Sequence, residues 1–101
     1  MILALGSDNS VVLDGLSDIQ TGAYINGATV TASVLNMDGT AVDGASGLPL
    51  SYVLGSNGKY QGTVPASVSL AIQDYFVDVV AVNMDGSQRT FRETVQGQWA
   101  E

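Results

Sequence analysis

Reactive side chains in this sequence are limited to carboxylates, hydroxyls and a few cations. The 101 residues contain no Cys and no His, which excludes thiolate and imidazole nucleophiles and the commonest zinc ligands. The only Lys, Lys59, follows Asn57-Gly58 in a predicted exposed turn, an unsuitable position for the basic member of a Ser-Lys dyad. We therefore expect no catalytic residues and a protein that is not an enzyme.

Carboxylates are numerous, but their spacing indicates turns. Asp38, Asp43 and Asp85 each precede a Gly, and Asp-Gly pairs supply the positive φ angles of tight turns. The EF-hand spacing and the Gly-Gly-x-Gly-x-Asp calcium repeat are both absent from the sequence. A paired-carboxylate hydrolase needs two carboxyl groups in different environments, whereas turn carboxylates share a solvated one. We expect no bound metal and no cofactor.

Charge and hydropathy exclude two further classes of partner. Three basic residues against ten acidic ones give a net charge of -7, which opposes binding to nucleic acid. Arg89, Phe91 and Arg92 are the only cluster of basic and aromatic residues, and we expect Arg89 or Arg92 to form a cross-strand ion pair. The most apolar run, 75–82, contains Asp78 and is far shorter than the roughly 18 residues of a membrane span.

The frequency of turns predicts the elements that carry these side chains. Six Asn-Gly or Asp-Gly pairs divide the chain into short segments, and residues 28–34 alternate strictly between apolar and hydroxyl side chains, as in a half-buried strand. Further strands are predicted at 10–13, 48–54, 59–64, 75–83 and 87–95. Segment 66–76 fits either a strand or a short helix, because short apolar runs are ambiguous in their periodicity.

Sequence patterns also indicate where the strands lie. The most apolar strand, 75–83, is expected at the centre of the sheet, and the mixed strand 87–95 at an edge. Pro49 indicates a second edge strand, because Pro cannot donate a ladder hydrogen bond. The four-residue motif Asn-Met-Asp-Gly occurs twice, at residues 36–39 and 83–86. We interpret the two copies as convergent hairpin turns in preference to a duplicated half-domain.

These observations predict an all-β fold, an immunoglobulin-like antiparallel β-sandwich of about seven strands. The division is an N-terminal arm at residues 1–10, the sandwich at 11–96 and a C-terminal tail at 97–101. Tyr75 either forms a tyrosine corner, in which its hydroxyl bonds to upstream backbone, or simply packs in the core.

Both ends of the chain are candidate contact segments. Met1, Ile2, Leu3 and Leu5 make the arm apolar, and Trp99 is the only Trp. The arm lacks the charged start and the apolar middle of a secretory signal, so we expect an unexported protein. The two ends either fold back onto their own sandwich or contact a partner, the arm by adding a strand and Trp99 as an anchor.

Several segments together resemble the small immunoglobulin-like proteins of tailed bacteriophages and prophages. The resemblance covers about residues 11–95, and adhesin repeats share its Gly-x-Tyr and Tyr-x-Val-x-Val elements. It is carried by Val12-Leu13-Asp14-Gly15-Leu16, Ala28-Thr29-Val30-Thr31-Ala32 leading into Asp38-Gly39-Thr40, Leu50-Ser51-Tyr52-Val53, Gly58-Lys59-Tyr60-Gln61-Gly62-Thr63 and Tyr75-Phe76-Val77-Asp78-Val79.

This resemblance implies a structural component of the virion, assembled in the host cytoplasm, and supplies no catalytic residue. The expected function is decoration of the capsid or attachment at the head-tail region. The major capsid protein or other virion proteins are then the partners, with a homo-oligomer as an additional expectation. The alternative function is an adhesion module that binds carbohydrate or a host surface.

Overall fold

Seven β-strands build the part of the chain that the computed structural model describes, residues 2–99 without the side chains of Ile2 and Trp99. No helix occurs among these residues, so the all-β prediction is confirmed, and the part of segment 66–76 that precedes β6 is irregular. The strands are β1 (Ile2–Leu5), β2 (Asn9–Leu13), β3 (Thr29–Asn36), β4 (Leu48–Tyr52), β5 (Tyr60–Val64), β6 (Asp74–Val82) and β7 (Gln88–Trp99).

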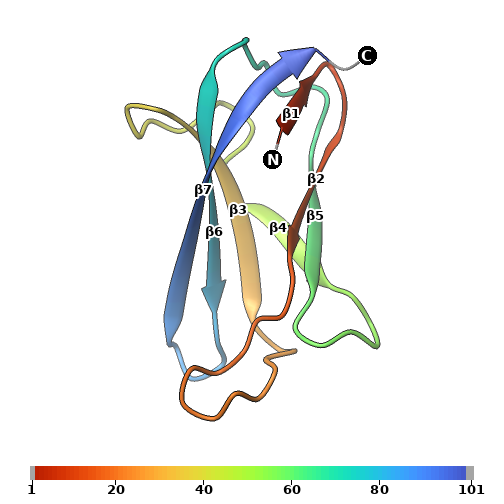
Figure 1. Ribbon diagram of the computed structural model, residues 1–101, viewed down its shortest axis with the longest axis vertical. Helices are drawn as coiled ribbons and strands as arrows, with labels where there is room; N and C mark the ends of the chain where they lie inside the picture. Colours follow the sequence, from red (N-terminus) through yellow and green to blue (C-terminus); the bar gives the residue numbers. More distant parts are fainter. Residues whose placement is uncertain (1, 100–101) are drawn as a thin grey trace.

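The strands form one continuous hydrogen-bonded order that curls into a nearly closed barrel. Its order is β1-β7-β6-β3-β4-β5-β2, so the first two strands of the sequence lie at opposite ends of the order. Only the short 6–8 connection separates β1 from β2 along the chain, and this brings the two ends of the order back together (Figure 1).

β4 carries the sheet from one layer to the other. Residues 48–50 of β4 pair with β3, and Ser51 and Tyr52 then pair with β5. The prediction that Pro49 marks an edge strand is therefore wrong, because β4 has neighbours on both sides. Pro49 is tolerated because it lies opposite Thr31 of β3, two residues before the pairing with β5 begins at Ser51.

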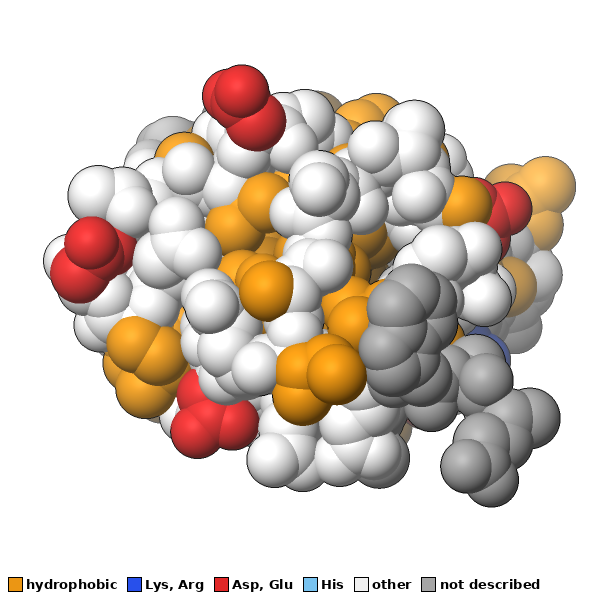
Figure 2. All heavy atoms as spheres, turned by 90° about the horizontal axis from the view of Figure 1, so that it is seen from above, with side chains coloured by type: hydrophobic (Ala, Val, Ile, Leu, Met, Phe, Trp, Pro, Cys, Tyr) orange, Lys and Arg blue, Asp and Glu red, His pale blue; other side chains and the backbone are white. Residues whose placement is uncertain are grey.

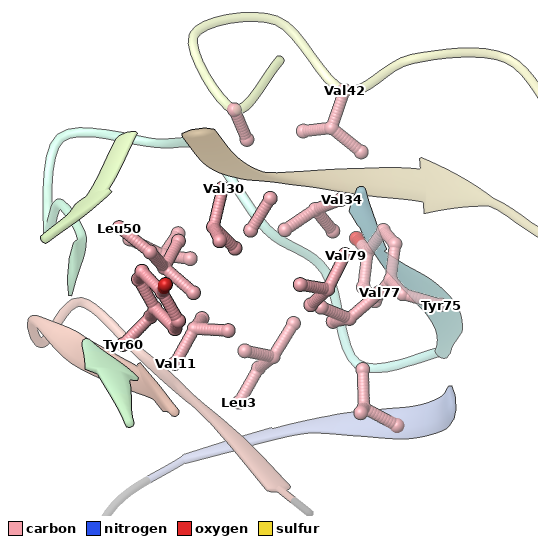
Figure 3. Close-up of a cluster of buried hydrophobic side chains, with 14 of the residues drawn as sticks. Leu3, Val11, Val30, Val34, Val42, Leu50, Tyr60, Tyr75, Val77 and Val79 are labelled. Carbon is pink, nitrogen blue, oxygen red and sulfur yellow. The ribbon is translucent and has the colours of Figure 1, made fainter. Parts of the chain in front are cut away.

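β6 is the central strand, as its composition predicts. It pairs with β3 on one side and β7 on the other, and its side chains alternate between buried and half-buried. Its buried set joins inward-facing residues of the other strands in a single core (Figure 3). The labelled members are Leu3, Val11, Val30, Val34, Val42, Leu50, Tyr60, Tyr75, Val77 and Val79. Each fully buried aliphatic side chain of this kind contributes about 1.5–3 kcal/mol to folding.

Tyr75 combines the two roles considered for it. Its ring is buried, and its hydroxyl accepts a hydrogen bond from the backbone N–H of Ala71 at 2.7 Å. A tyrosine whose hydroxyl bonds to backbone a few residues upstream is a tyrosine corner. The bond holds the irregular 65–73 connection against the start of β6.

β7 changes character along its length. Residues 88–94 pair with β6 alone, and all of them except the half-buried Arg89 are exposed. Gln96 pairs with both β6 and β1, residues 97–99 pair with β1 alone, in parallel, and Val95 is buried in the core. The predicted edge position is thus confirmed for the first part of β7.

Candidate protein-docking surface

The apolar N-terminal segment is part of the protein's own sheet. Ile2 to Leu5 form β1, and Leu3 and Leu5 are buried at 0% and 6% exposure. Of the two alternatives for this segment, the structure shows folding back. Met1 lies outside the described residues, and only the backbone of Ile2 and Trp99 is placed, where Ile2 pairs with Gln96 and Trp99 with Leu5.

Asn9 fastens β1 to the body of the protein. Its side-chain Oδ1 accepts from the Ala4 backbone N–H at 2.8 Å, and its Nδ2 donates to the Ala4 carbonyl at 3.0 Å. Asn9 is the buried polar residue of the described chain, and these bonds satisfy it. The strands β1, β2 and β7 extend beyond the 11–96 range predicted for the sandwich, into the segments predicted as arm and tail.

A different surface gathers exposed apolar side chains. We call it the loop face: loops 14–28, 53–59 and 83–87, which lie together at the lower end of the molecule in Figure 1. It presents Leu54, Met84 and Ile19 at 91%, 88% and 80% exposure, with Tyr24 at 54%. Large apolar side chains left exposed at one end of a molecule indicate a candidate site for another protein.

Direct hydrogen bonds brace two of these loops against each other. Leu16 N donates to the Gly58 carbonyl at 3.0 Å, and Gly58 N donates to Asn26 Oδ1 at 2.8 Å. Gly58 has φ +69°, and a Cβ there would lie 2.7 Å from Leu16 N and closer still to Leu16 O. Only glycine therefore fits at the point where loop 53–59 meets loop 14–28.

Tyr60 supports loop 14–28 from the core. Its ring is 1% exposed, and its hydroxyl reaches the loop, donating to the Ile25 carbonyl at 2.7 Å and accepting from Ala28 N at 3.1 Å. β7, which follows the third loop, is joined to loop 14–28 by Arg89, whose Nη1 donates to the Ser17 carbonyl at 3.0 Å. Met84 lies beside Gly27, with its sulfur 3.3 Å from the position that a Cβ of Gly27 would take.

A shallow hollow of about 360 Å³ separates loop 14–28 from loop 83–87. Ile19 stands on one side of it, and most of its remaining lining is polar, including Asp18, Asn83, Asp85 and Ser87. The Ser87 hydroxyl and backbone N–H both bond to Asp85, and these bonds hold the pKa of the Asp85 carboxyl below its ordinary value. Asp85 therefore stays negatively charged beside the exposed Met84.

The opposite end of the molecule also carries apolar and acidic side chains. Figure 2 shows this end from above, with hydrophobic side chains in the middle and acidic side chains around the rim. Its exposed members in loops 65–73 and 37–47 are Ile72 and Met37, at 68% and 50% exposure. They are fewer, and neither is as exposed as Ile19, Leu54 or Met84, so the loop face is the stronger candidate.

Within residues 2–99 no three or more carboxylates gather in an arrangement that would hold a metal ion. No helix in that range is long and apolar enough to cross a membrane. Comparison with known proteins gave no match: no family model fits the sequence, and no curated protein or solved structure is significantly similar.

The loop face was not predicted from the sequence, although a signal for it exists. Leu54 directly precedes Gly55, and Met84 directly precedes Asp85-Gly86. Turns lie at the surface, so a large apolar residue inside a tight turn is a candidate for exposure. Leu54 and Met84 are exposed, whereas Val42, which precedes Asp43-Gly44, is buried. Apolar residues within turns therefore indicate an exposed contact surface better than apolar residues at the chain ends do.

Proposed function

We propose that this protein is a non-enzymatic, immunoglobulin-like docking module that attaches to a phage particle as a structural component of the virion. The loop face carries the proposal, because it presents Ile19, Leu54 and Met84 on a hydrogen-bonded support. The sequence resemblance to small phage proteins supplies the kind of particle. Attachment then buries these side chains against a shell protein such as the major capsid protein.

Two features support the immunoglobulin-like form of the fold. The strands group as β2-β5-β4 and as β3-β6-β7, which parallels the B-E-D and C-F-G groups of immunoglobulin domains. The Tyr75 hydroxyl bond to Ala71 N occurs at the start of β6, the strand equivalent to the one that carries the tyrosine corner. In such domains the loops at one end of the sandwich commonly form the binding surface.

Energetics favour docking at many equivalent sites. Each aliphatic side chain buried from the loop face adds about 1.5–3 kcal/mol at best, and ordering the contact consumes part of that gain. Individually weak contacts become strong when many copies bind one symmetric shell. Negative charge near the hollow, from Asp18 and Asp85, complements a basic patch on the shell.

The tyrosines give less support to carbohydrate binding. Tyr60 and Tyr75 are buried, and Tyr52 is half-buried with its ring 5.7 Å from that of Tyr60. Tyr24 is the exposed tyrosine, so the described chain has no stacked pair of exposed tyrosine rings for a sugar.

Particles and purified protein together test the proposal. Mass spectrometry of particles induced from the source organism should detect the chain, and co-sedimentation should show the full chain binding particles that lack it. We expect Ile19→Asp and Met84→Asp each to weaken binding at least about tenfold, from lost apolar burial of about 1.5–3 kcal/mol per side chain. Ile72→Asp at the opposite end is the matched control and should bind as the unaltered protein does.

Three outcomes would contradict the proposal. The chain would be missing from purified particles, the loop-face variants would bind as well as the control, or the protein would bind glycans and not particles. Circular dichroism of each variant establishes that the fold is retained, so that lost binding is assigned to the surface.

A further inference from the structure

The edge of β7 offers a second interaction surface, separate from the loop face. From Gln88 to Thr94 this strand pairs with β6 on one side and with no described strand on the other, and β1 covers the same edge only from Gln96. In Figure 1 this stretch is the lower half of β7, at the left margin of the ribbon. An uncovered strand edge presents backbone N–H and C=O groups that another strand can pair with.

The sequence of this edge is complementary to itself in antiparallel order. With Phe91 placed opposite Phe91 of a second copy, Arg89 lies opposite Glu93, and Glu93 lies opposite Arg89. Opposite charges and aromatic pairs directly across an antiparallel ladder both stabilise it. A twofold axis through Phe91 thus produces two identical ion pairs around one aromatic pair.

The length of the uncovered edge also places the twofold axis at Phe91. Gln88 and Thr94 each lie three residues from Phe91, so pairing about Phe91 uses the whole edge. A register shifted toward the C-terminus runs into β1 at Gln96, and one shifted the other way runs into the 83–87 turn. Charge pattern and available length are independent observations, and both place the axis at Phe91.

Phe91 and Glu93 line a groove beside the edge. Arg89, Phe91 and Glu93 share the face of Val95, whose side chain is buried. Phe91 is 36% exposed and lines a groove of about 330 Å³ together with Val11, Val77 and Val79. A second copy would cover part of this apolar groove with its own Phe91.

Arg89 is held in position for the contact. Its Nη1 donates to the Ser17 carbonyl, and its guanidinium carbon lies 5.5 Å from the centroid of the Phe91 ring. A guanidinium has five N–H donors, so the bond to Ser17 leaves others for a carboxylate. The geometry therefore provides a fixed cation next to the aromatic ring at the axis.

We propose that two copies of this chain associate through β7, antiparallel and with Phe91 on the twofold axis, to form a continuous β6-β7-β7-β6 sheet. In this dimer the two loop faces point in opposite directions, because the paired strands run in opposite directions. The dimer does not use the loop face, so the test of dimerisation is independent of the test of docking to a particle.

Charge reversal tests the dimer by sedimentation equilibrium of the full chain over a range of concentrations. Arg89→Glu and Glu93→Arg each convert two attractive pairs into two repulsive ones, and we expect each to raise the dissociation constant at least about tenfold. The double variant R89E/E93R recreates both pairs with the charges exchanged and should restore the dissociation constant to within about threefold. Lys59→Glu makes the same charge change as R89E away from the edge and should leave dimerisation unaltered.

A single introduced cysteine provides a second measurement. The natural chain contains no Cys, so F91C supplies the only thiol and should form a disulfide-linked dimer on mild oxidation, since residue 91 alone faces its own copy. Q88C faces residue 94 of the second copy and should cross-link far more slowly. A chain that stays monomeric at all concentrations, or a dimer that single charge reversals leave unchanged, would overturn the proposal.

Discussion

Tyr60 connects the core to the loop face through a single side chain. Its ring packs among the buried aliphatic residues, and its hydroxyl bonds to both Ile25 and Ala28 at the far side of loop 14–28. Loop 14–28 is long and irregular, yet this buried hydroxyl and the contact with Gly58 fix its position. The exposed Ile19 and Tyr24 are therefore displayed on an ordered support.

Gly58 gives a prediction at the residue scale. Gly58→Ala should lower the free energy of unfolding by more than about 2 kcal/mol, because an L residue at this φ costs about 1–2 kcal/mol and the new Cβ also displaces Leu16. Gly55→Ala is the matched control: its φ is +80°, and a Cβ there meets nothing within 4 Å, so only the backbone cost of about 1–2 kcal/mol applies. Urea denaturation compares the two, and equal losses would contradict the proposed contact.

The repeated Asn-Met-Asp-Gly motif forms the same turn twice. In each copy the Asn N–H donates to the carbonyl of the residue four positions later, at 2.8 Å for both Asn36 and Asn83. The Asp carboxylate then accepts from the backbone N–H and the hydroxyl of Thr40 in one turn and of Ser87 in the other. The motif thus specifies a local turn, which agrees with interpreting it as convergent turn chemistry.

β1 gives a prediction at the scale of the element. Because Leu3 is 0% exposed within the core, Leu3→Ala should destabilise the fold by about 2–5 kcal/mol. If the N-terminal segment were a free arm, Leu3→Ala would not lower the stability of the fold. Leu54→Ala is the matched control, since Leu54 is 91% exposed and its removal should change stability by less than about 0.5 kcal/mol. Thermal unfolding followed by circular dichroism measures both, and equal stabilities would show that β1 does not pack as described.

Strand positions could be predicted, while the pairing of the ends could not. Alternation located β6 to within one residue and β3 to within two, and the turn pairs located the β4-β5 hairpin. Alternation identifies which face of a strand is buried but not which strand lies beside it. The parallel pairing of β1 with β7 therefore left no trace in the local pattern, because it joins opposite ends of the chain.

Loop 14–28 was unpredictable for a related reason. It contains two turn pairs, but the residues between them do not alternate, and its position depends on Tyr60 and Gly58, which are distant in the sequence. Leu3 and Leu5, two of the candidate contact residues at the N-terminus, are apolar and buried in the core. Those of the loop face are apolar and exposed, a distinction that only the tertiary structure makes.

At the scale of the whole molecule, acidic groups dominate the response to pH. Hydrogen bonds from Arg92, Thr40 and Ser87 lower the pKa values of Asp78, Asp38 and Asp85 respectively. A carboxyl whose folded pKa is depressed contributes stability that is present above its unfolded pKa of about 3.9 and is lost as pH falls through the folded value. Since the chain has no His, its net charge and stability should be nearly constant between about pH 6 and 8.

Asp78→Asn isolates the Asp78 contribution. Asp78 accepts from Arg92 Nε at 2.6 Å and from Nη2 at 2.8 Å, so the variant loses a two-bond ion pair. The difference in melting temperature between the natural chain and the variant should be constant above about pH 5 and shrink below about pH 4. Arg92→Gln should give the same profile. A difference that persists undiminished to pH 2 would show that the ion pair is not its source.

Parallel pairing also fixes the direction from which the chain enters the sheet. Ile2 lies opposite Gln96 and Leu5 opposite Trp99, so the start of β1 is the part nearest the uncovered stretch of β7. Extending β1 backward from Ile2 leads along that stretch, whereas extending β7 forward from Trp99 leads away from it. An N-terminal affinity tag would therefore act as a competing strand, and the choice of tag decides whether self-association of this protein can be observed.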